Sequence, residues 1–375
     1  MKIGIVGAGI GGLTAAAMLN EQGHQIEVFE KKAELSEVGA GIGIGGNVLN
    51  KLGQHDLAKG IKNAGQILER LNIYDQKGHQ LAEMGFSIET TNVTLKRQTL
   101  LDIIASYVPE HIIQLNHEVK YVEIKEEHVL LTFTNHETRA FDLVIGADGV
   151  HSNVRQAIFP KSKVNYQGYT CFRGIVDGME QMPHVADEYW GEKGRFGIVS
   201  LLNGQAYWFA TMNAKANDPK FKGFNKPYLQ AYFNHYPEAV RKVLDEQPET
   251  EILHHDIYDM KPLTTFTEAD RVVLLGDAAH TTTPNMGQGA TQAMEDAIVL
   301  ANVLQKYDTR SDALKRYNRL RVKHTKKVIK RSRKIGKMAQ KDRPISIKMR
   351  NALLKRMPER VMRRQTTFLF KSKKV

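Results

Sequence analysis

The sequence has one cysteine and no long run of apolar residues. Cys171 is the only cysteine among 375 residues, which excludes internal disulfides and a cysteine-ligated metal cluster, and we expect no metal site. No stretch of 18 or more apolar residues occurs, so we expect no membrane-spanning helix. The start, MKIGIVGAG, lacks the apolar core of a secretory signal and predicts a buried strand. We therefore expect a cytoplasmic protein.

Acidic residues are scarce towards the carboxyl end. From Lys315 to Val375 there are 24 Lys and Arg residues against only Asp342 and Glu359, whereas the whole chain carries a formal charge of +12. The basic charge from Lys326 to Lys337 favours a solvated helix face. The alternative is weak contact with anionic lipid, which would place the protein at the inner face of the membrane. No recognised nucleic-acid-binding fold accompanies the charge, so we expect no nucleic-acid partner. The oligomeric state is left open.

The length and the periodicities predict an α/β chain of two interleaved domains. A strand at 2–7, a helix at 11–22 and a strand at 25–30 form one parallel unit. The aromatic and β-branched residues of 164–212 predict antiparallel sheet. A helical pattern extends from Thr291 to about Lys341. Further strands are expected at 119–124, 128–134, 141–146 and, buried and parallel, 271–276.

The first glycine motif, GAGIGG, lies between the first strand and the first helix. Gly7 permits a tight turn, Gly9 lets the backbone approach a pyrophosphate, and Gly12 allows the helix to pack closely on the strand. The helix amino terminus supplies N–H groups and a favourable dipole for the anion. Glu30 ends the next strand, where a carboxylate can bind an adenosine ribose. The motif predicts a dinucleotide, with FAD and NAD both open.

Three further glycine-containing segments are candidate ligand-binding loops. One comes directly after the first strand–helix–strand unit, and the other two each follow an expected strand. The run GAGIGIGG, residues 39–46, favours a ligand-contacting loop over a flexible connection. In GADGVHSNVR, Asp148 and Gly149 are equally consistent with a ligand loop or an ordinary turn. In GDAAHTTTPNMGQG, the glycines free the backbone at a helix start, and His280 more often orients such a loop than acts as an acid or base. Signatures at both ends of the chain favour a long ligand, FAD.

These motifs, in this order and spacing, resemble the single-component flavin-dependent monooxygenases over residues 1 to about 340. That family includes salicylate, 4-hydroxybenzoate and urate hydroxylases, zeaxanthin epoxidase and the tetracycline-inactivating enzymes. The resemblance implies bound FAD, NAD(P)H as a transient co-substrate, and O₂. It implies hydroxylation or epoxidation of a small aromatic or polycyclic compound through a flavin C4a-hydroperoxide.

The resemblance also implies the cofactor-binding residues. Arg97, at the start of an R-x-x-L helix, would contact the flavin side, and the backbone of Val119 would face the adenine. Asp277 would bind the ribityl chain or the diphosphate. The full set comprises Gly7, Gly9, Gly11, Gly12, Glu30, Lys31, Gly43, Arg97, Val119, Asp148, Gly149, Asp277, Pro284, Gly287, Gln288, Gly289 and Ala290.

Arg195 and Tyr207 are the candidate catalytic residues. They lie on neighbouring expected strands joined by Asn203-Gly204, a strong hairpin signal. Their spacing is similar to the arginine–tyrosine pair of urate hydroxylases. Those enzymes have an aspartate where this chain has Asn285, so urate is not predicted as the substrate. For the aromatic run 207–209, sheet packing is favoured over an aromatic cage.

The predicted fold is a Rossmann-like FAD-binding domain interleaved with a smaller, mostly antiparallel β-sheet substrate domain, followed by carboxy-terminal helices. The expected ranges are 1–70, 95–163 and 262–340 for FAD, 71–94 and 164–261 for substrate, and 341–375 for the basic helical segment. A reductase or halogenase of the same fold is the first alternative, although the W-x-W-x-I-P signature of tryptophan-type halogenases is absent. A non-catalytic flavin protein that binds a membrane or partner is the second.

Overall fold

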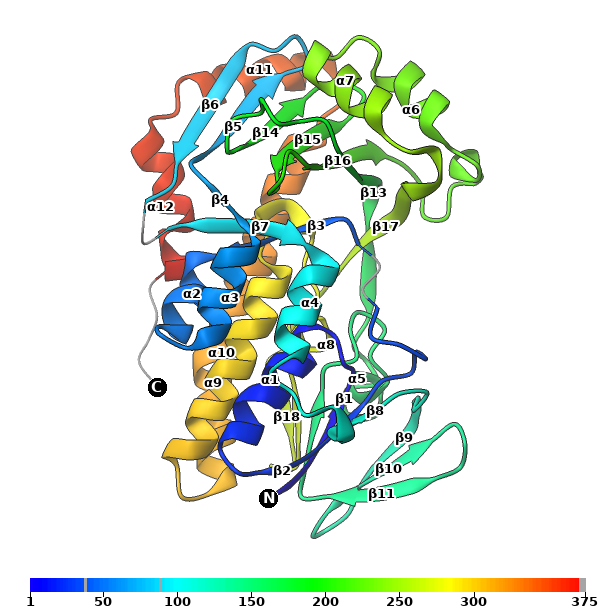
Figure 1. Ribbon diagram of the computed structural model, residues 1–375, viewed down its shortest axis with the longest axis vertical. Coiled ribbons are helices and arrows are strands. Elements are labelled where there is room, and N and C mark those ends of the chain that lie inside the picture. The colour runs from blue at the N-terminus through cyan, green and yellow to red at the C-terminus, as the bar shows by residue number, and fades with distance from the viewer. Residues whose placement is uncertain (37–38, 88–89, 371–375) are drawn as a thin grey trace.

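The computed structural model describes residues 1–36, 39–87 and 90–370 and confirms the predicted α/β class. Two large sheets lie towards opposite ends of an elongated molecule, and long helices extend between them (Figure 1). Two small antiparallel sheets complete the described part of the chain.

The first large sheet has six strands, ordered β18-β19-β12-β1-β2-β8. All neighbours are parallel except β18 and β19. Helices α1 and α9 pack against each other beside this sheet, and its central strands are buried, as is usual when both faces of a parallel sheet are covered. The carboxyl ends of β1, β12 and β19 therefore meet at one edge. The bounds are β1 (Lys2–Val6), β2 (Gln25–Phe29), β8 (Ile113–Gln114), β12 (Leu143–Gly146), β18 (Thr267–Glu268), β19 (Val272–Leu274), α1 (Ile10–Glu21) and α9 (Gly289–Lys306).

The two small sheets lie at different places in the molecule. One has the order β11-β10-β9 and projects at the lower right of Figure 1, with α5 against β9. The other, β3-β7-β4, lies between the two large sheets (Figure 1). The bounds are β3 (Gly41–Gly45), β4 (Gln66–Leu68), β7 (Asn92–Lys96), β9 (Val119–Ile124), β10 (Val129–Phe133), β11 (Thr138–Phe141), α2 (Gly46–Leu52), α3 (Asp56–Ala64), α4 (Arg97–Ala105), α5 (Asn153–Ile158) and the 3-10 turn η1 (Glu110–Ile112).

The second large sheet has seven strands, ordered β17-β13-β16-β15-β14-β5-β6, and only the β14–β5 pair is parallel. The antiparallel sheet predicted over 164–212 is confirmed. Asn203 and Gly204 have φ angles of 58° and 68°, as the predicted hairpin between β15 and β16 requires. The bounds are β5 (Arg70–Asp75), β6 (Gln80–Gly85), β13 (Val164–Val176), β14 (Val185–Trp190), β15 (Arg195–Ser200), β16 (Ala206–Asn213) and β17 (Leu253–Met260).

The two faces of the seven-stranded sheet differ in chemistry, because side chains alternate along each strand. One face packs its apolar residues, including Phe196 and Trp208, against α6 and α7. The other carries Arg173, Arg195 and Tyr207, which the strand register places on the same side. The covering elements are α6 (Lys226–Phe233), α7 (Glu238–Glu246), η2 (Pro219–Phe221) and η3 (Glu249–Glu251).

The carboxy-terminal helices connect the two large sheets. The continuous helical pattern predicted from Thr291 to Lys341 is wrong at one place: α9 ends at Lys306, and α10 (Arg310–Ala339) begins anew. The break occurs because Thr309 caps α10, its hydroxyl oxygen accepting the Asp312 N–H at 3.1 Å. Two shorter helices follow, α11 (Pro344–Lys355) and α12 (Glu359–Phe370). Among the described helices, none is both long and apolar enough to cross a membrane.

A buried ion network joins α10 to α9. The Arg321 guanidinium of α10 bonds the carboxylates of Asp296 at 2.5 Å and Glu295 at 2.9 Å. Asp296 also accepts the backbone N–H of Gly276 at 2.9 Å and a bond from His280. Burial alone would raise the pKa of Asp296, but His280 and Arg321 outweigh it and lower the pKa to about 2. The carboxylate is therefore charged and fully paired at neutral pH.

We expect Arg321→Leu to lower the free energy of unfolding by about 3–5 kcal/mol, because it removes the buried cation that the two carboxylates share. Glu295 then keeps Lys51, at 3.5 Å. Asp296 keeps His280 and the Gly276 N–H. Urea denaturation followed by circular dichroism at neutral pH measures the loss. Arg319→Leu is the matched control, since Arg319 is exposed two residues earlier on α10. A loss below about 1 kcal/mol in Arg321→Leu, the scale of an ordinary surface change, would contradict the role given to the network.

Candidate active site

The first glycine motif forms a tight turn at the carboxyl end of β1. Gly7 has a φ of 101°, and a Cβ there would lie 2.6 Å from the carbonyl oxygen of Ala147. A Cβ on Gly12 would lie 1.9 Å from the Gly7 carbonyl oxygen. Gly9 is the N-cap of α1, so the free N–H groups of that helix begin at the turn. The turn therefore presents backbone donors and excludes side chains, as a pyrophosphate site requires.

The remaining residues expected at the adenosine end lie around this turn. The Glu30 carboxylate accepts the Ala8 N–H at 2.9 Å, and its backbone carbonyl accepts the His117 N–H at 2.8 Å. Val119 follows at the start of β9, while the Lys31 side chain is exposed beside Glu30. Gly11 points elsewhere: a Cβ there would meet Leu275 at 2.8 Å and Ala293 of α9 at 3.1 Å. Its smallness serves helix packing behind the turn.

Arg155 ties the second motif to the third. Its guanidinium donates to the carbonyl oxygens of Ala278 at 3.1 Å and Val150 at 2.7 Å, and the side chain is buried. Asp148 accepts the Val154 N–H at 3.0 Å through one oxygen, while the other is buried with no hydrogen-bond partner among the described residues. Burial raises the pKa of Asp148. No role for Arg155 was predicted from the sequence, although this arginine is the last residue of the motif GADGVHSNVR.

The third motif forms a short helix, a turn and the start of α9. Helix α8 (Asp277–His280) begins with the exposed Asp277, and η4 (Pro284–Met286) follows. The buried His280 bonds Asp296, which supports the loop-orienting interpretation over the acid–base one. Gly287 has a φ of 59°. A Cβ on Gly287 or Gly289 would meet no atom within 4 Å, so the surface here is open.

The glycine run in β3 lies against the start of α9. The Gly45 N–H donates to the Thr291 hydroxyl at 3.1 Å, and a Cβ on Gly45 would approach the Gln288 amide at 3.3 Å. A Cβ on Gly43 would lie 3.1 Å from the Asn92 side-chain oxygen, a buried atom without a partner in the described structure. The structure thus brings Gly45 alongside the start of α9. Residues 41–45 form strand β3 and not the loop or flexible connection expected from the sequence, because they pair with β7, and contact with a ligand stays a prediction.

Arg97 and Ala290 complete the same region. Arg97 starts α4, and its backbone N–H donates to the Ala40 carbonyl at 3.0 Å. Its side chain passes close to Gly39, where a Cβ would lie 2.5 Å from the Arg97 Cδ atom. Ala290 packs, partly buried, on the main apolar core. Residues 37–38, just before the run, lie outside the described residues.

Together these groups fit an extended FAD. Glycine cradles occur at both ends of the region, and Asp148 and Asn92 each have a buried side-chain oxygen without a hydrogen-bond partner among the described residues. Donors at the α1 amino terminus suit a pyrophosphate, and the open surface at Gly287 and Gly289 suits a flat ring. Each end is formed by segments that are distant in the sequence.

A cationic floor lies on the inner face of the seven-stranded sheet, formed by Arg173, Arg195, Tyr207 and Phe209. The Arg195 guanidinium lies 5.0 Å from the Phe209 ring centre, and its Nη1 atom is 3.5 Å from a Glu188 carboxylate oxygen. Its Nε and Nη1 atoms are buried without hydrogen-bond partners in the part of the chain described. The predicted pair Arg195 and Tyr207 thus shares one face, and Arg173 is a residue that sequence analysis missed.

Tyr207 connects this floor to β3. A Cβ on Gly41 would lie 2.5 Å from the Tyr207 side chain, so the glycine is what allows the two sheets to approach. Burial raises the pKa of Tyr207 to about 12, although the charges of Arg173, Arg195 and Arg97 act to lower it. Its phenol is therefore protonated at neutral pH.

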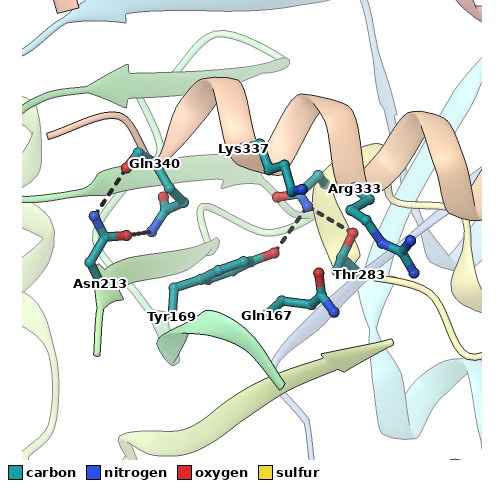
Figure 2. Close-up of a pocket in the computed structure, with 9 residues that line it drawn as sticks. Gln167, Tyr169, Asn213, Thr283, Arg333, Lys337 and Gln340 are labelled. Carbon is teal, nitrogen blue, oxygen red and sulfur yellow. Dashed lines mark hydrogen bonds between the residues drawn. The ribbon is translucent and has the colours of Figure 1, made fainter. Parts of the chain in front are cut away.

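A polar cavity of about 220 Å³ lies between the seven-stranded sheet, the third motif and α10 (Figure 2). Asn285 donates to the Tyr169 hydroxyl at 3.0 Å and to the Ser332 carbonyl at 3.1 Å, while its side-chain oxygen is buried without a partner in the described structure. Tyr169 is also within electrostatic range of Arg195. The lining residues labelled in Figure 2 are Gln167, Tyr169, Asn213, Thr283, Arg333, Lys337 and Gln340.

Comparison with known proteins gives consistent matches. A family model described as an FAD binding domain matches residues 1–332. Aurachin C monooxygenase/isomerase from Stigmatella aurantiaca is 32% identical over 359 residues, covering 94% of this chain and 93% of the relative. The 2-heptyl-3-hydroxy-4(1H)-quinolone synthase of Pseudomonas aeruginosa is 28% identical over 376 residues, covering 99% and 98%. A crystal structure of a Klebsiella pneumoniae HpxO variant complexed with FAD matches with a TM-score of 0.89 at 25% identity, covering 99% of each chain.

We expect Gly12→Ala to abolish FAD retention, because a Cβ 1.9 Å from the Gly7 carbonyl oxygen forces the turn open. Flavin absorbance per mole of purified protein, and titration of the apoprotein with FAD, measure the effect. Gly60→Ala in α3 is the control, since its Cβ would meet only an Ile103 methyl group at 3.2 Å. Full flavin occupancy in folded Gly12→Ala would show that the turn does not hold the cofactor.

Proposed function

Because the chain belongs to the FAD binding domain family of monooxygenases, we propose that its substrate is a small aromatic compound with an anionic oxygen and an apolar substituent. The protein is an FAD-dependent monooxygenase that uses NAD(P)H and O₂. The monooxygenase and hydroxylase relatives favour this activity over a reductase, a halogenase or a non-catalytic flavin protein.

The observation that carries the proposal is that the buried Nε and Nη1 atoms of Arg195 make no hydrogen bond within the described residues, although Nη1 is ion-paired with Glu188 at 3.5 Å. A buried donor without a partner costs about 1–3 kcal/mol, so a ligand oxygen is its natural complement. Arg173 adds a second cation on the same face, and Glu188 is the acid nearest Arg195. A carboxylate, phenolate or enolate oxygen suits this surplus of positive charge, and a planar guanidinium can bind it with two donors.

An apolar wall adjoins the floor. Leu68, Ala186 and Val199 form a buried cluster, with Leu71 and Phe86 partly exposed beside it. Tyr207 and Phe209 of the cationic floor pack against this cluster and so join the floor to the apolar wall. This arrangement supports a substrate with a charged head and an apolar part. Two of the relatives are named for aurachin and a heptyl-substituted quinolone.

We assign the cofactor-binding roles as follows. Gly7, Gly9 and Gly12 would hold the pyrophosphate with the α1 N–H groups, and Glu30 would bind the ribose. Asp277 would bind the ribityl chain or diphosphate, and Gly287 to Ala290 would lie against the ring. Bound FAD supplies electron transfer from NAD(P)H and the activation of O₂. The expected ranges 1–70, 95–163 and 262–340 for FAD, and 71–94 and 164–261 for substrate, are part of this proposal.

The floor residues orient the substrate. Arg195 binds the anionic oxygen, which keeps the substrate ionised and its neighbouring ring carbon electron-rich. Tyr207 is protonated at neutral pH, since its pKa is about 12, so it donates a hydrogen bond and does not act as a base. Asn285 is neutral, and its N–H groups are directed to protein oxygens. A mechanism that needs a carboxylate at this position is not supported, so we do not propose urate.

We also propose a weak contact between the basic carboxy-terminal segment and anionic membranes. Lys348 and Lys355 of that segment, residues 341–375, are exposed. Just before it, the lysines of α10 between 326 and 337 are exposed as well, whereas Val328, Ile329 and Ser332 face the interior. The contact would place the protein at the inner face of a membrane.

We expect Arg195→Gln to raise KM for the substrate about 10- to 100-fold with unchanged FAD content, the loss typical of one charged hydrogen bond. The substrate is found by screening aromatic carboxylates, phenols and quinolones for stimulated NAD(P)H oxidation. Arg195→Lys should recover part of the loss, and Arg241→Gln, exposed on α7, is the control. Equal stimulation of the wild type by uncharged isosteres would contradict an anionic substrate.

A further inference from the structure

The outward face of α11 carries a stripe of large apolar side chains, Ile345, Met349 and Leu353. Their exposed fractions are 75%, 68% and 56%. The spacing of four residues aligns them on one side of a helix. Isolated apolar residues on a surface are ordinary, but an aligned row of three marks an interaction site.

The opposite face fixes this helix firmly to the protein. Arg350 is buried and donates to the carbonyl oxygens of Ala339 at the end of α10 and Trp190 of β14, each at 3.1 Å. Leu354 is buried in a cluster with Ile73 and Leu81. The stripe is therefore presented by a docked helix in a set orientation. In Figure 1, α11 lies across the end of the molecule that holds the seven-stranded sheet.

Positive charge surrounds the stripe. Lys348 and Lys355 are exposed along one side of α11, and Arg356 and Arg360 follow at its end. The two acids that flank α11 in the sequence both have partners: Asp342 accepts a hydrogen bond from the Asn213 side chain at 3.2 Å, and Glu359 is paired with Arg363 at 2.8 Å. An apolar row beside cations is complementary to a bilayer with anionic headgroups. A second copy of the same face would oppose like charges, which disfavours a symmetric dimer.

We propose that α11 is a membrane-docking helix whose Ile345, Met349 and Leu353 side chains enter the interface of an anionic bilayer. This deepens, and rests on, the weak membrane contact proposed above. That contact rests on charge alone. Here the apolar side chains on the outward face of α11 also insert into the bilayer. Lys348 and Lys355 would lie at the lipid phosphates.

Docking through α11 also brings the substrate-facing sheet to the membrane. Trp190, whose carbonyl holds Arg350, is paired in register with Arg195. Helix α11 also packs on β6 at the edge of the same sheet. An aromatic compound with an apolar substituent concentrates in the bilayer, so this orientation places the sheet that carries the cationic floor next to that supply.

Vesicle flotation of the full-length, FAD-loaded protein tests the proposal. We expect binding to vesicles of phosphatidylcholine mixed with phosphatidylglycerol and much less to phosphatidylcholine alone. The triple variant Ile345→Ser, Met349→Ser, Leu353→Ser should weaken binding at least about tenfold, because the inserted apolar area is lost. Lys348→Gln with Lys355→Gln should weaken it about fivefold per charge. Tyr228→Ser, at a residue 59% exposed on α6, is the control and should bind like the wild type.

Three results would overturn the proposal. The first is failure of the wild type to bind the mixed vesicles, and the second is equal binding by the triple variant. The third is a concentration-dependent dimer, seen by sedimentation and lost in the triple variant, without vesicle binding, which would make the stripe an interface between copies. FAD content and NAD(P)H oxidation in vesicle-free buffer should be unchanged in the triple variant. These readouts separate failed docking from failed catalysis.

Discussion

Arg321 of α10 bonds two buried carboxylates of α9, and the arrangement around the cofactor region depends on that contact. Asp296 in turn bonds the Gly276 N–H and the His280 ring, and these two bonds fix the backbone of the GDAAH segment. Arg155 bonds the same segment from the side of the second motif. Buried charges tolerate little displacement, because an unpaired one costs several kcal/mol. The network therefore positions the start of α9, where a flat ring would lie.

Arg321 and Arg195 are both buried, but they lie in opposite electrostatic environments. Arg321 is buried and fully paired, so it serves structure. Arg195 is also buried, but its Nε and Nη1 atoms make no hydrogen bond among the described residues, and its one ion pair there is with Glu188 at 3.5 Å. Low solvent exposure makes such a cation a strong attraction for an anionic ligand. In the function proposed here, the two sheets divide these tasks: the cofactor would lie on the parallel sheet and the substrate on the cationic floor of the antiparallel one.

Much of this arrangement was predictable from local patterns. The turn at Gly7, the hairpin at Asn203-Gly204 and the shared face of Arg195 and Tyr207 follow from glycine chemistry and strand alternation. The hydrogen-bond partners of Arg155 and Arg321 could not be predicted from the sequence. Periodicity shows on which side of a helix or strand a residue lies, but not which distant carbonyl or carboxylate it contacts. The break before α10 carried a readable signal, Thr309 followed three residues later by Asp312. The outward direction of the α11 stripe depends on how Arg350 docks, and no local pattern reports that.

A crystal structure of the protein with FAD and an anionic aromatic ligand tests the central claim most directly. The account predicts the flavin ring against Pro284 to Ala290 and the ligand oxygen bonded to Arg195, with the ligand between the ring and the sheet. A ring that lies elsewhere, or a ligand seated away from Arg195 in the cavity lined by Arg333 and Lys337, would contradict it.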